Sequence, residues 1–356
     1  MNHRLDADTY ELLDQIFHSV YDLEYGFAVA GVILNIPHLI ICLQKPLRNI
    51  NAYSMIIAIA ISDLTATSVI SYHRTLNWFI IENLCRNHYS YFYKFSILVI
   101  QTLDESMILV SLFVGMLLTI IRFIVLKLNF NSGNFTKPYV GYIIFVIILF
   151  LNVTASGYLY FRMTLATISP WIPPKECTEF PVNYSEPAYE LVFPDIKNNN
   201  EYLKFYQFYV GYSLVSCTFN FSRLKYICFQ LAISIIYPCL ALALYLQIRT
   251  SAKNVARLRN SSKFPFFCRY RTSRMILVFT LSYIVCSTPM GLIWLTSSLI
   301  HIEIMSLLSL LVSYGIVFSP ALFCMNASVQ CMICFIFSPK YRETAKTLLG
   351  FKKKAV

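Results

Sequence analysis

Three polar residues in the segment 99–127 are spaced so that one face of a helix carries all of them. Asp104 precedes Ser111 by seven residues and Arg122 by eighteen, which is close to two and to five helical turns. At about 1.5 Å of rise per residue, the acid and the base lie roughly 27 Å apart, close to the thickness of a bilayer's hydrocarbon core. Such a helix can offer a carboxylate to a cation near one membrane surface and a guanidinium near the other. Both residues could instead be helix-end groups that reach water, and this helix alone leaves the two interpretations open.

A further acid, Asp63, lies in the middle of another apolar run. The motif Ser62-Asp63-Leu64 falls within about residues 50–72, which places its carboxylate near the centre of a bilayer. A lone carboxylate at that depth is energetically costly and usually marks a functional position. We therefore interpret Asp63 as a functional residue.

The composition predicts an all-α membrane protein. Hydrophobic residues make up 57% of the 356-residue chain and charged residues 13%, which excludes an ordinary soluble domain. Seven apolar runs predict a seven-transmembrane helix bundle over residues 25–337, after an amino-terminal tail at 1–24. The tail 338–356 should contain a short amphipathic helix on the membrane surface, begun by Ser338 and Pro339. We expect the seven helices at about 25–43, 50–72, 95–122, 138–161, 226–248, 274–300 and 305–337.

The net charge of +11 is distributed unevenly along the chain. Nineteen of the 29 Lys and Arg residues follow the first, third, fifth and seventh apolar runs, where Glu343 is the single acid, and the other ten lie elsewhere. Because Lys and Arg accumulate on the cytoplasmic side, this bias predicts a multi-pass plasma-membrane protein with an extracellular amino terminus. The positive charge follows the topology and does not indicate nucleic-acid binding.

The longest connection, about residues 162–225, is predicted to be extracellular and contains two Asn-x-Ser sequons. They begin at Asn183 and at Asn220, which lies near the membrane, and we expect N-glycosylation there. Other sequons fall in the membrane or cytoplasm on this topology, and we expect no modification of them.

Several motifs together resemble those of rhodopsin-like G-protein-coupled receptors. Asp63 lies in the second apolar run, and Arg122 closes the third. In the sixth run, Tyr283-Ile-Val-Cys-Ser287-Thr-Pro289 is similar to the family's Phe-x-x-Cys-Trp-x-Pro, with Ser287 in the place of Trp. The resemblance implies that Tyr283, Ser287 and Pro289 form the switch of the sixth helix.

Departures from the general pattern narrow this resemblance. Ile121 stands where the family has an acid beside the arginine, and the segment 330–334 takes the place of Asn-Pro-x-x-Tyr. With Asn326-Ala-Ser and the Ser-x-x-Tyr-Arg motif at 338–342, these features resemble the nematode class-W serpentine chemoreceptors (Srw). That group is similar to FMRFamide-type neuropeptide receptors.

The resemblance implies roles for individual residues. By position, Asp63, Ser111 and Asn326 would form a sodium pocket made of oxygen ligands. Asp104 stands where amine receptors hold a ligand ammonium, and Glu105 follows it as a second candidate for ligand binding. Arg122 would couple the receptor to its G protein.

The family's disulfide between the third helix and the outer loop cannot form in the usual place, because Ile97 replaces the cysteine. The resemblance then implies a substitute disulfide between Cys85 and Cys177. Cys217 is an alternative partner.

These observations favour a receptor without a catalytic site over an enzyme. We expect it to bind an extracellular ligand and to activate a heterotrimeric G protein. Acids in the tail, in the long loop and at Asp104 and Glu105 favour a cationic ligand, such as a neuropeptide or a peptide-like chemosensory cue. An amine or odorant receptor of the same fold is an alternative, as is a seven-helix ligand-gated channel or transporter. We expect no cofactor, apart from a possible bound sodium ion.

Overall fold

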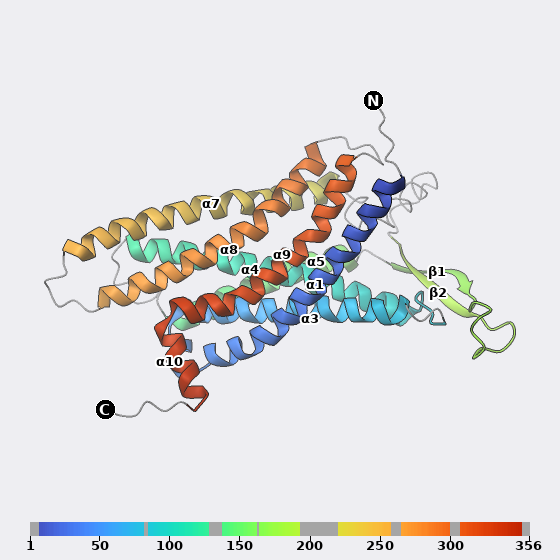
Figure 1. Cartoon of the computed structure of the whole chain (residues 1–356), viewed down its shortest axis with the longest axis horizontal. Coiled ribbons are helices and arrows are strands. Elements are labelled where there is room, and N and C mark those ends of the chain that lie inside the picture. Colours follow the sequence, from blue (N-terminus) through green and yellow to red (C-terminus); the bar gives the residue numbers. More distant parts are fainter. Residues whose placement is uncertain are drawn as a thin grey trace.

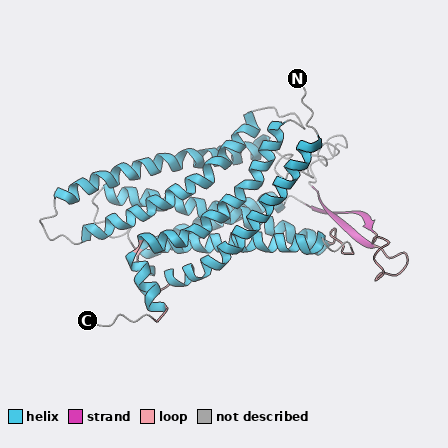
Figure 2. Cartoon of the chain, viewed as in Figure 1, coloured by secondary structure: helices cyan, strands magenta, loops and turns pink. Residues whose placement is uncertain are grey.

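A bundle of seven long helices makes up most of the computed structural model, which describes residues 7–81, 85–127, 137–161, 164–192, 220–257, 265–299 and 307–350 (Figures 1 and 2). Seven of the described helices are long and apolar enough to cross a membrane, so the expected fold class is confirmed. The long helices are α1 (Ala7–Cys42), α3 (Asn51–Ile81), α4 (Tyr91–Lys127), α5 (Pro138–Phe161), α7 (Asn220–Arg257), α8 (Pro265–Leu299) and α9 (Leu307–Phe337).

The helix α4 has a central position in the bundle. It packs against α3, α5, α7 and α8, whereas α1 packs mainly against α3 and α9. Ser111, at the middle of α4, is fully buried. The polar face of α4 that the sequence indicates therefore looks into the bundle at mid-depth.

Several helices continue beyond the apolar runs that predicted them. The first begins at Ala7 rather than near Tyr25, so most of the expected tail at 1–24 is helical. No proline or glycine lies between these two residues, and nothing in the backbone ends the helix where the apolar run ends. Hydropathy therefore identifies the segment of each helix that suits a membrane, and backbone chemistry sets its full length.

The short helix α10 (Pro339–Leu348) lies across one end of the bundle (Figure 1). The Ser338 side chain accepts a hydrogen bond from the Tyr341 backbone N–H at 3.1 Å, which confirms the predicted N-cap. Tyr341 is buried, and its hydroxyl is hydrogen-bonded to His38 Nδ1 of α1 at 2.9 Å. Part of the apolar face of α10 thus packs on the bundle, while Leu348 stays exposed. The four-residue helix α2 (Lys45–Arg48) connects α1 to α3 near this end.

A β-hairpin at the opposite end was not predicted from the sequence. Strands β1 (Thr164–Trp171) and β2 (Glu186–Val192) pair antiparallel, with Ile168 opposite Ala188. The hairpin lies at the same end as the beginning of α1 and far from α10 (Figure 1). We call the hairpin end the outer end of the bundle and the α10 end the inner end.

Covalent and polar contacts attach the hairpin to the bundle. Cys85 and Cys177 form a disulfide with a Cα–Cα distance of 5.5 Å, as predicted, while the alternative partner Cys217 lies outside the described residues. The Asn87 side chain donates a hydrogen bond to Glu186 at 3.0 Å, and the Tyr184 hydroxyl donates another. The hydrogen bond from Tyr184, and to a smaller extent that from Asn87, lowers the pKa of the Glu186 carboxyl because it stabilises the charged form.

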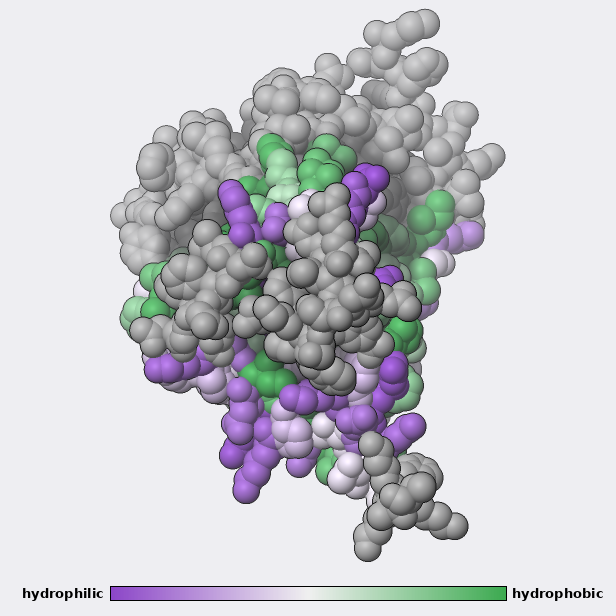
Figure 3. Space-filling model, turned by 90° about the vertical axis from the view of Figure 1, so that its left-hand side faces the viewer, coloured by the Kyte–Doolittle hydropathy of each residue, from purple (hydrophilic) through white to green (hydrophobic). Residues whose placement is uncertain are grey.

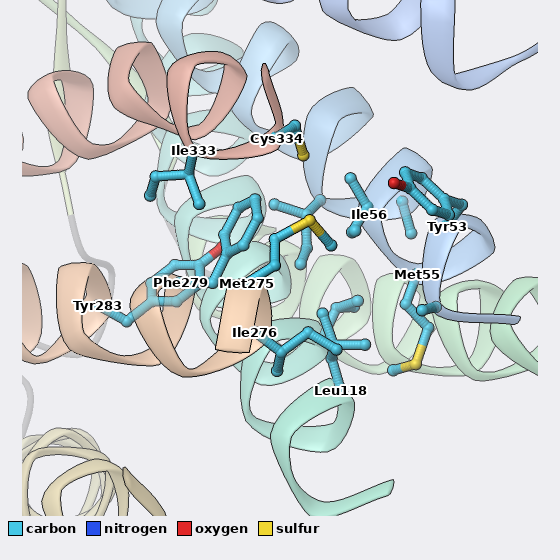
Figure 4. Packing of buried hydrophobic residues seen from close by; sticks show 14 of the residues in the cluster. Tyr53, Met55, Ile56, Leu118, Met275, Ile276, Phe279, Tyr283, Ile333 and Cys334 are labelled. Atoms are coloured by element: carbon cyan, nitrogen blue, oxygen red, sulfur yellow. The ribbon is translucent and has the colours of Figure 1, made fainter. Parts of the chain in front are cut away.

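The main hydrophobic core fills the inner half of the bundle and joins α3, α4, α8 and α9. Figure 4 shows members of this core, among them Tyr53 and Met55 of α3, Leu118 of α4, and Met275 and Phe279 of α8. All five side chains are at most 3% exposed. This packing fixes the helices around the polar groups described next.

Candidate functional site

All three residues implied for a sodium pocket are buried, on the helices α3, α4 and α9. Asp63 and Ser111 are 0% exposed and Asn326 is 2% exposed. The side chains of Ser111 and Gln330 lie beside the Asp63 carboxylate. Even so, neither carboxylate oxygen of Asp63 and neither side-chain polar atom of Asn326 has a hydrogen-bond partner of good geometry in the described part of the chain. We call Asp63, Ser111, Asn326 and Gln330 the inner centre.

Tyr283 of α8 connects the inner centre to a second buried tyrosine. Its hydroxyl is hydrogen-bonded to Ser111 Oγ at 3.0 Å and accepts a hydrogen bond from Gln330 Nε2 at 3.1 Å. Its ring stacks on Tyr237 of α7 with the centroids 5.5 Å apart. The predicted switch residue Tyr283 therefore touches α4, α7 and α9 at once.

Gly115 allows the two tyrosines to lie against α4. A Cβ atom at this position would stand 2.6 Å from Tyr283 Cε2 and 2.9 Å from the Tyr237 hydroxyl. Tyr237 also donates a hydrogen bond to the backbone oxygen of Leu112. The close approach of α4, α7 and α8 therefore depends on the absence of a side chain at Gly115.

The other residues of the predicted switch lie on α8 nearby. Ser287 is 2% exposed, and its hydroxyl has no hydrogen-bond partner in the described part of the chain, while its backbone oxygen accepts a bond from Ser234 of α7 at 2.8 Å. Pro289 lies inside α8, where it has no N–H to donate to the preceding turn. A small side chain next to a weakened turn makes this part of α8 a natural place for bending.

The predicted ligand residue Asp104 lies in the outer half of the bundle among other charged groups. Its Oδ1 atom is buried and has no hydrogen-bond partner in the described ranges. The charge that acts on it most strongly is that of Glu24 on α1, followed by Glu105 and then Arg74 on α3. Two carboxylates on different helices therefore face one guanidinium. We call Glu24, Arg74 and Asp104 the outer cluster.

Arg74 forms an ion pair with Glu24, which is 4% exposed. The guanidinium also lies over the ring of Tyr21, with Cζ 3.8 Å from the centroid. The ion pair joins α3 to α1, because the helical extension of α1 brings Glu24 beside α3.

An apolar layer lies between the outer cluster and the inner centre. Ala28 stands one turn below Glu24 on α1, and Ile70 and Ala66 stand one and two turns below Arg74 on α3. The layer consists of Ala28, Ala66, Ile70, Phe323 and Cys324, all at most 4% exposed. The two acidic sites therefore occupy separate compartments of the bundle.

Arg122 lies near the inner end of α4, far from Asp104. It lines a cavity of about 300 Å³ together with Asn49, Asn51, Leu118 and Ile121. Figure 3 looks onto this end of the molecule and shows hydrophilic side chains gathered beside hydrophobic ones. The structure thus places Arg122 at the surface opposite the hairpin.

The sequence model of the family described as serpentine type 7TM GPCR chemoreceptor Srw matches residues 22–352. This match runs from α1 to beyond the end of α10. The protein belongs to the Srw family of chemoreceptors. No curated protein matches the chain.

Sequence reasoning had not assigned three residues of this Srw chemoreceptor's two polar sites. Gln330 had been placed where the Asn of Asn-Pro-x-x-Tyr is usual, but its contact with Tyr283 could not be read from the chain. Glu24 falls in the expected tail at 1–24, and Arg74 falls just beyond the expected helix at about 50–72. The spacing of Glu24 and Arg74 in the sequence does indicate that they face the bundle. Glu24 lies three turns before Asn35, and Arg74 lies three turns after Asp63, so each pair shares one helical face.

Proposed function

We propose that this Srw chemoreceptor binds a cationic, peptide-like ligand in the outer half of its bundle and activates a heterotrimeric G protein. The supporting observation is Asp104, whose Oδ1 atom is buried without a hydrogen-bond partner in the described residues and on which two acids, Glu24 and Glu105, act more strongly than Arg74. Burial of a carboxylate without a hydrogen bond or counter-charge is unfavourable. A ligand ammonium or guanidinium supplies both, and Glu105 adds to the negative potential that attracts it.

The proposed coupling step takes place at the opposite end. Ligand binding favours a conformation in which α8 bends at Pro289 and opens the bundle beside Arg122. Tyr283 links this movement to the inner centre, because its hydroxyl contacts both α4 and α9. The G protein then docks against Arg122 and the basic inner loops, without any catalytic residue in the receptor.

The inner centre fits a sodium ion by the chemistry of its groups. Asp63 offers two unpartnered carboxylate oxygens, Asn326 an unpartnered amide oxygen, and Ser111 a hydroxyl. Small hard cations prefer oxygen ligands of this kind. We propose that these three residues hold Na⁺ and that the ion stabilises the resting conformation.

The proposed orientation places the amino terminus and the hairpin outside the cell. The disulfide Cys85–Cys177 supports it, because disulfides persist in oxidising surroundings. Asn183 is exposed in a turn of the hairpin loop, where a glycan meets no obstacle from the described residues. Asn220 begins α7, and its side chain lies outside the described part. We propose glycosylation at both.

A GTP-binding assay tests the proposed function. Membranes with the receptor and a co-expressed G protein are screened with amidated peptides that carry basic residues and with small amines, and ligand-stimulated GTP binding is measured. We expect acceleration by a cationic peptide. A ligand-gated ion current without any GTP binding would favour a channel, and a response to neutral odorants alone would remove the role of Asp104.

A further inference from the structure

The outer cluster contains an ion pair between Arg74 and Glu24 beside the acid Asp104. Glu24 is 4% exposed and is stabilised there by its counter-charge. Tyr21 packs on the guanidinium and limits its orientation. Asp104 is close enough to experience both charges, and that of Glu24 acts on it more strongly than that of Arg74.

We propose that Arg74 sets the charge of the ligand group that Asp104 accepts. By neutralising Glu24, it leaves Asp104 as the carboxylate of the cluster that still needs a cation. The site then accepts an ammonium or guanidinium with one positive charge and selects against a compact dication. This inference rests on the proposed function, because it requires that Asp104 faces the ligand.

The charge balance predicts different results for each variant. Without the charge of Arg74, two carboxylates face the ligand, and a dication becomes the better match. Without the charge of Glu24, Arg74 turns to Asp104 and occupies the position of the ligand cation. When both charges are removed, one carboxylate remains and binding of a monocation returns. A purely structural ion pair would not produce this rescue by the double variant.

A reporter cysteine measures this balance without a known agonist. Gln101→Cys places a thiol on α4 one turn outward from Asp104. In intact cells, its modification by a cationic methanethiosulfonate is timed in the presence of butylamine or 1,4-diaminobutane, which match in length and differ in charge. Val182→Cys on the hairpin, at a position that is 93% exposed, gives the control rate for a thiol far from the cluster.

We expect butylamine to protect the reporter better than 1,4-diaminobutane when the outer cluster is intact. Arg74→Gln should reverse this preference, with a change of about tenfold in the ratio, which corresponds to about 1.4 kcal/mol. Glu24→Gln should abolish protection by both amines. Glu24→Gln combined with Arg74→Gln should restore protection by butylamine.

The failure of this inference differs from that of the proposed function. An unchanged order of the amines in Arg74→Gln, or a double variant that behaves like Glu24→Gln, would overturn the role of Arg74 while Asp104 keeps its own. If the reporter reacts with neither a cationic nor an anionic reagent, or if Asp104→Asn leaves protection intact, the outer cluster is not a ligand site and both proposals are wrong.

Discussion

Asp63 and Asp104 are both carboxylates inside the bundle with oxygens that lack hydrogen-bond partners in the described residues, yet their surroundings differ. Beside Asp63 lie the neutral side chains of Ser111 and Gln330. Around Asp104 the neighbours are charged, and Glu24 is already paired with Arg74. Neutral oxygens can surround a small bare cation. Charged neighbours suit an organic cation whose position is selected by electrostatic complementarity.

The apolar layer between the two sites gives this comparison a testable form. Residues that share no partners usually make additive contributions, whereas residues in one network do not. Ala28 and Ile70 lie between the outer cluster and the inner centre. We therefore expect changes at Asp104 to act directly on ligand binding and changes at Asp63 to act directly on sodium binding. The two sites should influence each other only through the conformational equilibrium that the ligand and sodium bias in opposite directions.

The largest expected effect is that of Asp104→Asn on agonist potency. Removal of one partner of a desolvated charge pair costs about 2–5 kcal/mol in binding, so the midpoint of the dose–response curve should move by more than tenfold. The maximal response at saturating agonist should survive, because Arg122 is unchanged. Glu105→Gln is the matched control on the next helical position and should shift the midpoint less. An unchanged midpoint in Asp104→Asn would make this acid structural.

A smaller effect should follow from closing the space that Gly115 leaves for the two tyrosines. The added methyl group of Gly115→Ala would clash with Tyr283 and Tyr237, and overpacking should lower the free energy of unfolding by about 1–2 kcal/mol. Gly26→Ala is the control, since a Cβ there meets nothing within 4 Å. Thermal unfolding of the two purified variants measures the difference. Equal melting temperatures would mean that the inner centre tolerates repacking.

Sodium at the inner centre should change the stability by an amount similar to or smaller than the effect of Gly115→Ala, and in the opposite direction. If Na⁺ binds the folded state, replacing choline by sodium at constant ionic strength should raise the melting temperature, by on the order of 1 kcal/mol in stability at concentrations a few times Kd. Asp63→Asn should remove this dependence, whereas Asp104→Asn should retain it. A sodium effect that survives Asp63→Asn would place the ion elsewhere.

The sequence predicted those parts of the molecule that depend on helical periodicity. Seven apolar runs predicted the bundle, and the spacing of Asp104 and Arg122 agrees with their places in opposite halves of α4. The disulfide between Cys85 and Cys177 is the one that the resemblance to the family implied. Each of these features depends on residues within one element or on a covalent pair that few alternatives can satisfy.

The parts that were missed depend on contacts between elements. The pairing of β1 with β2 required a partner strand that loop composition does not reveal, and the ion pair of Glu24 with Arg74 required the length of α1 beyond its apolar run. The hydrogen bond between Gln330 and Tyr283 required the relative rotation of α8 and α9. Helix rotation is set by packing between elements, and hydropathy does not report how far a helix continues beyond its apolar run, so spacing alone could suggest these contacts but not establish them.

The smallest effect on function should come from removing the hairpin glycan, yet this experiment decides which of the two sites faces outward. Asn183 has a positive φ of 67°, a conformation that asparagine tolerates better than glutamine. Ser185→Ala therefore removes the sequon with less strain than Asn183→Gln. After expression in eukaryotic cells, we expect Ser185→Ala to increase gel mobility, and glycosidase treatment to reduce the difference from the unchanged protein. Asn260→Gln, in a sequon between α7 and α8, is the matched control and should leave mobility unchanged. A shift with Asn260→Gln instead would put the inner end outside the cell, and Arg122 rather than Asp104 would then face the extracellular ligand.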